Sequence, residues 1–117
     1  MQSVSKLTNL DYLENFTKGD KERMKKYIEM YLKSTPDVIR DFQKEFNDLN
    51  LENLRLKAHS IKPQAKYFGI KILEDILIEI ETIIKSNKDV DKLQPLISNA
   101  IQINEKIASE LTTILNA

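Results

Sequence analysis

Residues 51–68 read LENLRLKAHSIKPQAKYF, and their apolar positions decide the fold class. These positions recur in alternating steps of three and four, the spacing that places side chains on one face of an α-helix. The stripe consists of Leu51, Leu54, Ala58, Ile61, Ala65 and Phe68. Such a stripe is typical of a helix that packs inside a bundle.

Three helices are expected before this stretch, and the first two come before Thr35. Asn9 is placed to cap a short helix over residues 10–17 that Gly19 ends, and Asp20 is placed to cap a second helix. The second helix has one apolar face, made of Met24, Tyr27, Ile28, Tyr31 and Leu32.

The pair Thr35-Pro36 predicts the start of a third helix, because Thr is a good N-cap and Pro fits the first helical position. This helix is expected to run to about Asp48, and Asn50 is expected to cap the helix that follows. Its apolar stripe is Val38, Ile39, Phe42, Phe46 and Leu49.

Two more helices are predicted after the quoted stretch. Gly69 ends or bends its helix, a further helix covers residues 70–86, and a turn at 86–89 precedes a last helix over 90–115. Because such short connections make neighbouring helices antiparallel, the last four helices should form the core. The sequence therefore predicts an all-α fold, an up-and-down antiparallel four-helix bundle with one or two additional N-terminal helices.

The composition favours one domain and excludes several classes of function. The chain has 117 residues, of which 41% are hydrophobic, so residues 1–117 are expected to form a single domain. Basic and acidic residues balance at 18 each, which argues against a partner such as nucleic acid or an anionic membrane. The absence of Cys excludes disulfide scaffolds, zinc knuckles and thiol catalysis.

No segment predicts export or membrane insertion. Residues 1–10 are polar and lack the apolar core of a signal peptide. The most apolar window, 76–84, is too short for a membrane span and contains Glu79 and Glu81. A cytoplasmic monomer is therefore expected. The start at Met1 and the lack of linker composition favour a self-standing chain, while excision from a larger protein stays open.

The single histidine, His59, lies off the apolar stripe. Its position is roughly 130° from the centre of that stripe, so the imidazole should face solvent. Arg55, Lys62 and Lys66 lie one or two turns away on the same outward side. Cations at this spacing repel one another, and a bound anion with about two negative charges would reverse that effect. An ordinary solvated helix face is the alternative interpretation.

Residues 56–70 read LKAHSIKPQAKYFGI and resemble the signature of histidine phosphotransfer (HPt) domains. In that signature an Ala-His pair is followed by an apolar residue, a Lys, small residues and a Gly. The matching positions are Ala58, His59, Ile61, Lys62 and Gly69. The resemblance extends over most of the chain and implies a helical bundle that carries a phosphoryl group.

The resemblance also implies roles for three residues. His59 would be the phosphoacceptor through Nε2, and Lys62 would steady the phosphoryl oxygens. Glu81 occupies the position from which a Gln or Glu of the family hydrogen-bonds the imidazole Nδ1. Such a carboxylate would fix the tautomer that leaves Nε2 free as a nucleophile. For Glu81, a solvated surface carboxylate is the alternative.

One position departs from the family pattern. Pro63 stands where Gly or Ser is usual, one turn after the histidine. A proline inside a helix cannot donate to the carbonyl four residues earlier, here that of His59, so a local bend or widening is expected. Leu56, Pro63 and Tyr67 would give His59 an apolar rim for docking. With Arg55 and Lys66 they form the predicted partner-binding residues.

The resemblance thus implies a carrier that relays a phosphoryl group between receiver domains of a hybrid histidine kinase and a response regulator. The sequence shows no nucleotide-binding motif, so we expect a carrier without autonomous catalysis or a cofactor. Mg²⁺ is expected on the receiver only. Two alternatives are a helical protein-protein adaptor in which His59 is incidental and an enzyme that uses His59 as general base. The second is poorly supported, because no nucleophile or second acid is placed nearby.

Overall fold

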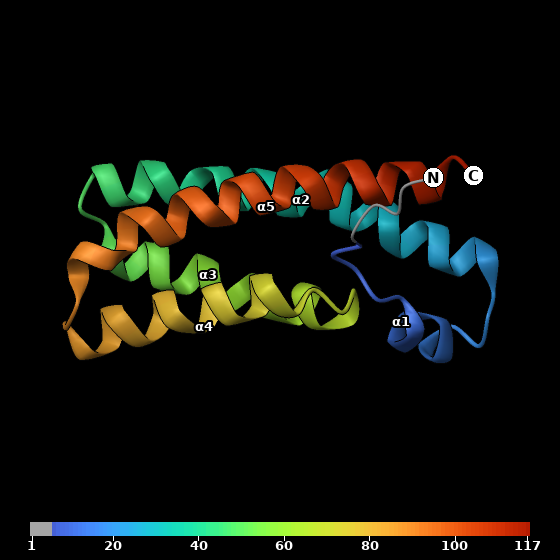
Figure 1. The fold of residues 1–117 in the computed structure, drawn as a ribbon, viewed down its shortest axis with the longest axis horizontal. Helices are drawn as coiled ribbons and strands as arrows, with labels where there is room; N and C mark the ends of the chain where they lie inside the picture. The colour runs from blue at the N-terminus through green and yellow to red at the C-terminus, as the bar shows by residue number, and fades with distance from the viewer. Residues whose placement is uncertain (1–5) are drawn as a thin grey trace.

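The computed structural model describes residues 6–117, which form an all-helical structure (Figure 1). Residues 1–5, part of the polar segment that argued against a signal peptide, lie outside the described residues. The elements are α1 (Asp11–Phe16), α2 (Lys21–Asn47), α3 (Leu51–Tyr67), α4 (Lys71–Ser86), the 3₁₀ turn η1 (Val90–Lys92) and α5 (Leu93–Leu115).

Helices α2 to α5 form an antiparallel four-helix bundle. Helix α2 packs against α5 and α3, while α4 packs against α3 and α5. In Figure 1, α2 and α5 run along one layer, and α3 and α4 along the other. The pair α2 and α5 extends past the end of α3 and α4, and α1 lies beside this extension. The predicted all-α bundle is therefore confirmed, with α1 as its one additional N-terminal helix in residues 6–117.

The predicted helix break at Thr35-Pro36 is wrong. Both residues lie inside α2, a single helix of 27 residues, and Thr35 is buried rather than placed as an N-cap. Proline inside a helix costs about 3 kcal/mol. The helix nevertheless continues, because apolar residues on both sides of Pro36, such as Tyr31 and Ile39, are buried on one face. Burial of a large apolar side chain contributes about 2 kcal/mol, so a few such residues offset the cost.

The end of α2 also differs from the expectation. Leu49 belongs to the predicted apolar stripe, but it is 81% exposed and has a φ of 60°. Its amide donates to the carbonyl of Phe46, and that of Asn50 to Glu45, so Leu49 occupies the left-handed position that closes a helix. A residue that turns the chain in this way cannot continue the stripe of the helix it ends.

The helix starts agree in part with the predicted caps. The Asp20 side chain accepts from the amides of Glu22 and Arg23 at 3.0 and 3.2 Å, so this cap is confirmed. The Asn9 side chain accepts from the Asp11 amide, although Leu10 is the N-cap residue of α1. Asn50 stands at the N-cap position of α3 but makes no capping hydrogen bond with its side chain.

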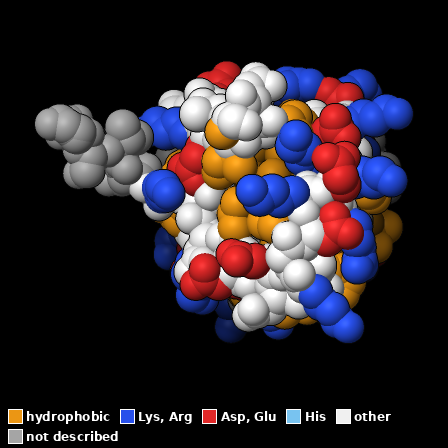
Figure 2. All heavy atoms as spheres, turned by 90° about the vertical axis from the view of Figure 1, so that its right-hand side faces the viewer, with side chains coloured by type: hydrophobic (Ala, Val, Ile, Leu, Met, Phe, Trp, Pro, Cys, Tyr) orange, Lys and Arg blue, Asp and Glu red, His pale blue; other side chains and the backbone are white. Residues whose placement is uncertain are grey.

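The core lies between the two helical layers. Its largest fully buried side chains include Tyr31, Phe42 and Phe68. Figure 2 shows the end of the bundle where α1 and the C-terminus of α5 lie, with hydrophobic side chains gathered among charged ones. None of the helices in residues 6–117 is long and apolar enough to cross a membrane.

Candidate functional site

The site is built around His59 on the outward face of α3. The neighbouring Ala58 and Ile61 are buried in the core and fix the rotation of this helix. His59 itself keeps 62% of its side chain exposed. The imidazole therefore stands on a rigid element and is open to another molecule, in the orientation that the helical spacing predicts.

Glu81 of α4 lies beneath the imidazole. One carboxylate oxygen, Oε1, is 3.0 Å from His59 Nδ1, and the other, Oε2, is 2.6 Å from Lys62 Nζ. Glu81 is only 4% exposed, so it is not a solvated surface carboxylate. A buried carboxylate is strongly destabilising unless it is paired, and here two partners from α3 pair it.

The charge of Glu81 determines the tautomer of His59. Burial raises the pKa of the Glu81 carboxyl, but its hydrogen bonds and ion pairs with Lys62 and His59 outweigh this and leave the pKa below its usual value. The carboxylate is therefore ionised at neutral pH and can only accept hydrogen bonds. It follows that Nδ1 is protonated and that this N–H donates a hydrogen bond to Glu81 Oε1. In the neutral ring, Nε2 is then the nitrogen with a free lone pair.

The cations around His59 are not equivalent. On α3, Arg55, Lys62 and Lys66 lie roughly 20–60° to one side of His59. Arg55 makes a bidentate ion pair with Glu52, at 2.9 and 2.5 Å, and Lys62 pairs with Glu81. Lys66 is exposed one turn further along. Two of the three predicted cations are thus partly neutralised, so the repulsion inferred from sequence is smaller than expected.

The other side of His59 is apolar. Leu56, Pro63 and Tyr67 lie roughly 40–80° away around α3, and all three are exposed. The Tyr67 ring stacks on Tyr12 of α1, with centroids 5.6 Å apart and planes 9° from parallel. Phe16 of α1 stacks on the same ring at 6.4 Å. His59 thus lies on the boundary between a basic stripe and an apolar stripe.

Tyr12 and Phe16 are absent from the residues predicted for the site. Both rings are about half exposed, and they stand four residues apart on a helix of six residues. Two exposed aromatic residues on one face of so short a helix are a signal for a contact with another element. Nothing in the amino-acid order indicates which element that is.

Helix α3 continues through Pro63 without a break. Because proline has no N–H, the carbonyl of His59 lacks the helical hydrogen bond that residue 63 would otherwise supply. The structure confirms that Pro63 stands inside the helix, next to the exposed imidazole. The expected bend stays a prediction.

No resident metal site is evident near these residues. Within residues 6–117, no group of three or more His, Cys, Asp or Glu side chains is arranged to hold a metal ion. The chemistry that this site offers is a nucleophilic nitrogen, a carboxylate that can stabilise positive charge on the ring, and cations that can neutralise an anion.

One comparison with known proteins identifies a family for this chain. The pattern of a family described as the Hpt domain matches residues 26–117, which include His59, Lys62 and Glu81. Searches of curated proteins and of solved structures found no significant match. The matched region covers most of the chain and begins inside α2, so α1 precedes it. The chain belongs to the Hpt domain family, whose members carry phosphoryl groups in phosphorelays.

Proposed function

We propose that this protein relays a phosphoryl group between the aspartates of two receiver domains through Nε2 of His59. One observation carries the proposal: an exposed imidazole whose Nδ1 is held by a buried, ionised Glu81. This arrangement leaves one ring nitrogen nucleophilic and keeps the ring in a fixed orientation.

In the proposed transfer step, His59 acts as the nucleophile. The Nε2 lone pair attacks the phosphorus of a receiver phospho-aspartate in line with the bond to the aspartate oxygen. The N–P bond forms, the P–O bond breaks, and the aspartate leaves as a carboxylate. The Nδ1 proton stays on the ring, where Glu81 stabilises the positive charge that develops. Transfer to the aspartate of a second receiver reverses these bond changes.

Lys62 supports the proposed transfer on the basic side. It lies one turn from His59, is partly exposed, and approaches Glu81 to 2.6 Å. From this position its ammonium group can turn toward the oxygens of a phosphoryl group on Nε2. Lys66 and Arg55 add positive charge along the same stripe. Mg²⁺ would be supplied by the receiver, and we propose no resident cofactor for this chain.

The proposed receiver-docking face combines the two stripes. Leu56, Pro63 and Tyr67 offer apolar contacts, while Arg55 and Lys66 offer charge. Protein interfaces combine apolar contacts with polar and charged ones, and the two stripes offer both. Receiver domains of a hybrid histidine kinase and of a response regulator are the proposed partners.

The proposal is tested by incubating the protein with a phosphorylated receiver domain. A label that is labile in acid and stable in alkali should appear on the wild type and be absent from His59→Gln. Ser60→Ala is the matched control, because Ser60 is the next residue on the exposed side of α3 and this variant should still accept the label. A label on His59→Gln would show that His59 is not the acceptor, and no label on either protein with several receivers would favour the adaptor interpretation.

A further inference from the structure

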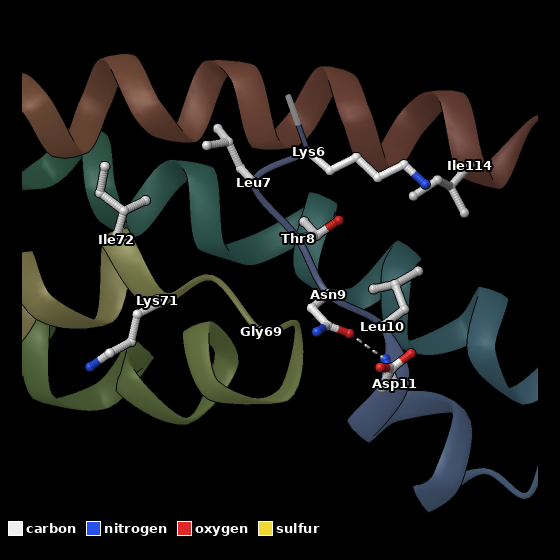
Figure 3. A pocket seen from close by; sticks show the side chains of 10 residues that line it. All are labelled: Lys6, Leu7, Thr8, Asn9, Leu10, Asp11, Gly69, Lys71, Ile72 and Ile114. Atoms are coloured by element: carbon white, nitrogen blue, oxygen red, sulfur yellow. Dashed lines mark hydrogen bonds between the residues drawn. The ribbon is translucent and has the colours of Figure 1, made fainter. Parts of the chain in front are cut away.

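Residues 6–10, which we call the strap, run from α5 to the turn between α3 and α4 (Figure 3). The Glu110 carboxylate of α5 holds its first part. The amide of Leu7 donates to Oε1 at 2.8 Å, and the amide of Thr8 donates to Oε2 at 2.9 Å. The Thr8 hydroxyl also donates to Oε2. One carboxylate therefore accepts three hydrogen bonds from two consecutive residues.

The strap is attached a second time, at the end of α3. The amide of Asn9 donates to the carbonyl of Phe68 at 2.9 Å. At Gly69 a Cβ atom would collide with the backbone of Asn9, and Gly69 has a φ of 62°. Glycine thus permits both the turn and the close approach of the strap.

Apolar packing supports the strap only in part. Leu7 and Leu10 pack against the core but are partly exposed. A cavity of about 700 Å³ lies beside the strap, lined by the strap itself and by residues that include Gly69, Ile72 and Ile114 (Figure 3). A segment with few buried apolar contacts opens at low free-energy cost unless hydrogen bonds hold it. The hydrogen bonds to Glu110 and Phe68 therefore contribute much of the free energy that holds the strap in place.

The strap leads directly into α1, and α1 leads to the proposed docking face. The Asn9 side chain accepts from the amide of Asp11, the first residue of α1. Tyr12 and Phe16 of α1 then stack on Tyr67, which lies two turns after His59 on the same helix. A continuous series of contacts thus joins Glu110 on α5 to the apolar stripe beside His59.

We propose that Glu110 is a positioning residue: by holding the strap, it places the aromatic side chains of α1 on Tyr67 and so shapes the receiver-docking face beside His59. This inference rests on the proposed function and adds α1, which precedes the family match at residue 26, to the docking face. The hydrogen bonds of Glu110 go to Leu7 and Thr8 and not to His59, Lys62 or Glu81, so it acts on docking rather than on the phosphoryl group.

The test compares Glu110→Gln with Glu105→Gln, which makes the same chemical change at an exposed position of α5. Glu110→Gln should raise amide hydrogen exchange at Leu7 and Thr8 by about tenfold, because a neutral amide accepts more weakly than a carboxylate. It should also shift the ring NMR signals of Tyr67. Glu105→Gln should change neither.

Transfer from a phosphorylated receiver gives the functional readout. For Glu110→Gln the KM for the receiver should rise by about three- to tenfold, while the rate at saturating receiver stays within about twofold, since His59, Lys62 and Glu81 are untouched. Thr8→Val removes one of the three donors and should give a smaller effect of the same kind, so the test does not depend on one variant.

The possible failures are distinguishable. If Glu110→Gln speeds exchange in the strap but leaves the Tyr67 signals unchanged, Glu110 is a local anchor and the inference is wrong. It is equally wrong if the Tyr67 signals move and KM does not. If wild type itself accepts no phosphoryl group at His59, the proposed function fails, whereas the NMR comparison still decides whether Glu110 positions α1.

Discussion

At the scale of single residues, the site depends on a buried acid beside an exposed base. The outward position of His59 is predictable from sequence, because one helical stripe fixes the rotation of α3. The same periodicity places Glu81 at the edge of the stripe on the next helix and leaves open whether it is buried. Burial of Glu81 depends on how α3 and α4 pack, and this packing brings His59 and Lys62 onto one carboxylate.

Replacing Glu81 tests this arrangement. Glu81→Ala removes the acceptor for Nδ1–H, so the imidazole should populate both tautomers and rotate more freely. We expect transfer to His59 to slow by about tenfold or more, as is typical when the group that orients a functional histidine is removed. Glu81→Gln keeps an acceptor for Nδ1–H and should retain more of the rate. Rapid-quench transfer kinetics measure both, and equal rates for wild type and Glu81→Ala would show that Glu81 plays no part.

Two carboxylates should make the stability depend on acid pH. Burial raises the pKa of Glu110, as it does that of Glu81, but the hydrogen bonds from Thr8 and Leu7 outweigh it and leave the pKa below its usual value. A folded-state pKa below the unfolded value stabilises the protein above the unfolded pKa, about 4.3 for Glu. That contribution is lost as the pH falls through the folded-state pKa.

The contribution of these two carboxylates to the free energy of unfolding should therefore be nearly constant above about pH 5. It should decrease as the pH falls below about 4. The basic groups that face these carboxylates are His59, Lys62 and Arg55 at Glu81 and Lys6 at Glu110. Urea unfolding at a series of pH values measures the effect. Glu81→Gln with Glu110→Gln should show a smaller acid dependence than wild type, and an unchanged dependence would refute the assignment.

At the scale of helices, α2 shows where local sequence signals mislead. Thr35-Pro36 has the chemistry of a helix start, yet Pro36 lies in the middle of a helix of 27 residues. Helix propensity describes a segment in isolation. The buried residues on both sides of Pro36 stabilise the helix only through packing against α3 and α5. The stacking of α1 on Tyr67 was unpredictable for the same reason, because it joins residues far apart in the sequence.

Pro36→Ala should stabilise the protein. The substitution restores an N–H that can donate to the Leu32 carbonyl and removes the crowding by the proline ring. We expect a gain of about 1–3 kcal/mol in the free energy of unfolding. Pro95→Ala is the matched control, since Pro95 lies in the first turn of α5, where the N–H has no helical partner. Denaturant titration should show a small effect there, and equal effects for both variants would rule out the explanation.

At the scale of the whole molecule, a buried polar pair joins helices α2 and α5. The Tyr31 hydroxyl of α2 donates to the Asn104 side chain of α5 at 2.7 Å, and burial raises the pKa of Tyr31. The bundle itself is predictable, because several segments of the sequence each carry an apolar stripe with the helical period. The pair is not, because the helical period places Tyr31 and Asn104 on the buried faces of their own helices without indicating that the two side chains meet.

Removing one member of the pair should cost more than removing both. Tyr31→Phe leaves the buried Asn104 amide without its partner, which should cost about 1–3 kcal/mol. Tyr31→Phe with Asn104→Leu leaves no unpaired polar group and should recover part of that loss. Chemical denaturation of the two single variants and the double variant measures the coupling. Additive effects would show that the pair does not contribute to stability as a unit.

The proposed relay requires that Glu81 hold Nδ1 so that Nε2 of His59 accepts the phosphoryl group, and ¹⁵N and ³¹P NMR of protein labelled in its one histidine can observe both nitrogens. Before transfer, at a pH where the imidazole is neutral, we expect a protonated Nδ1 and an unprotonated Nε2. After incubation with a phosphorylated receiver, we expect a new ³¹P signal coupled to Nε2. Coupling to Nδ1, or a ring protonated at Nε2 before transfer, would show that the assignment of the two nitrogens is wrong.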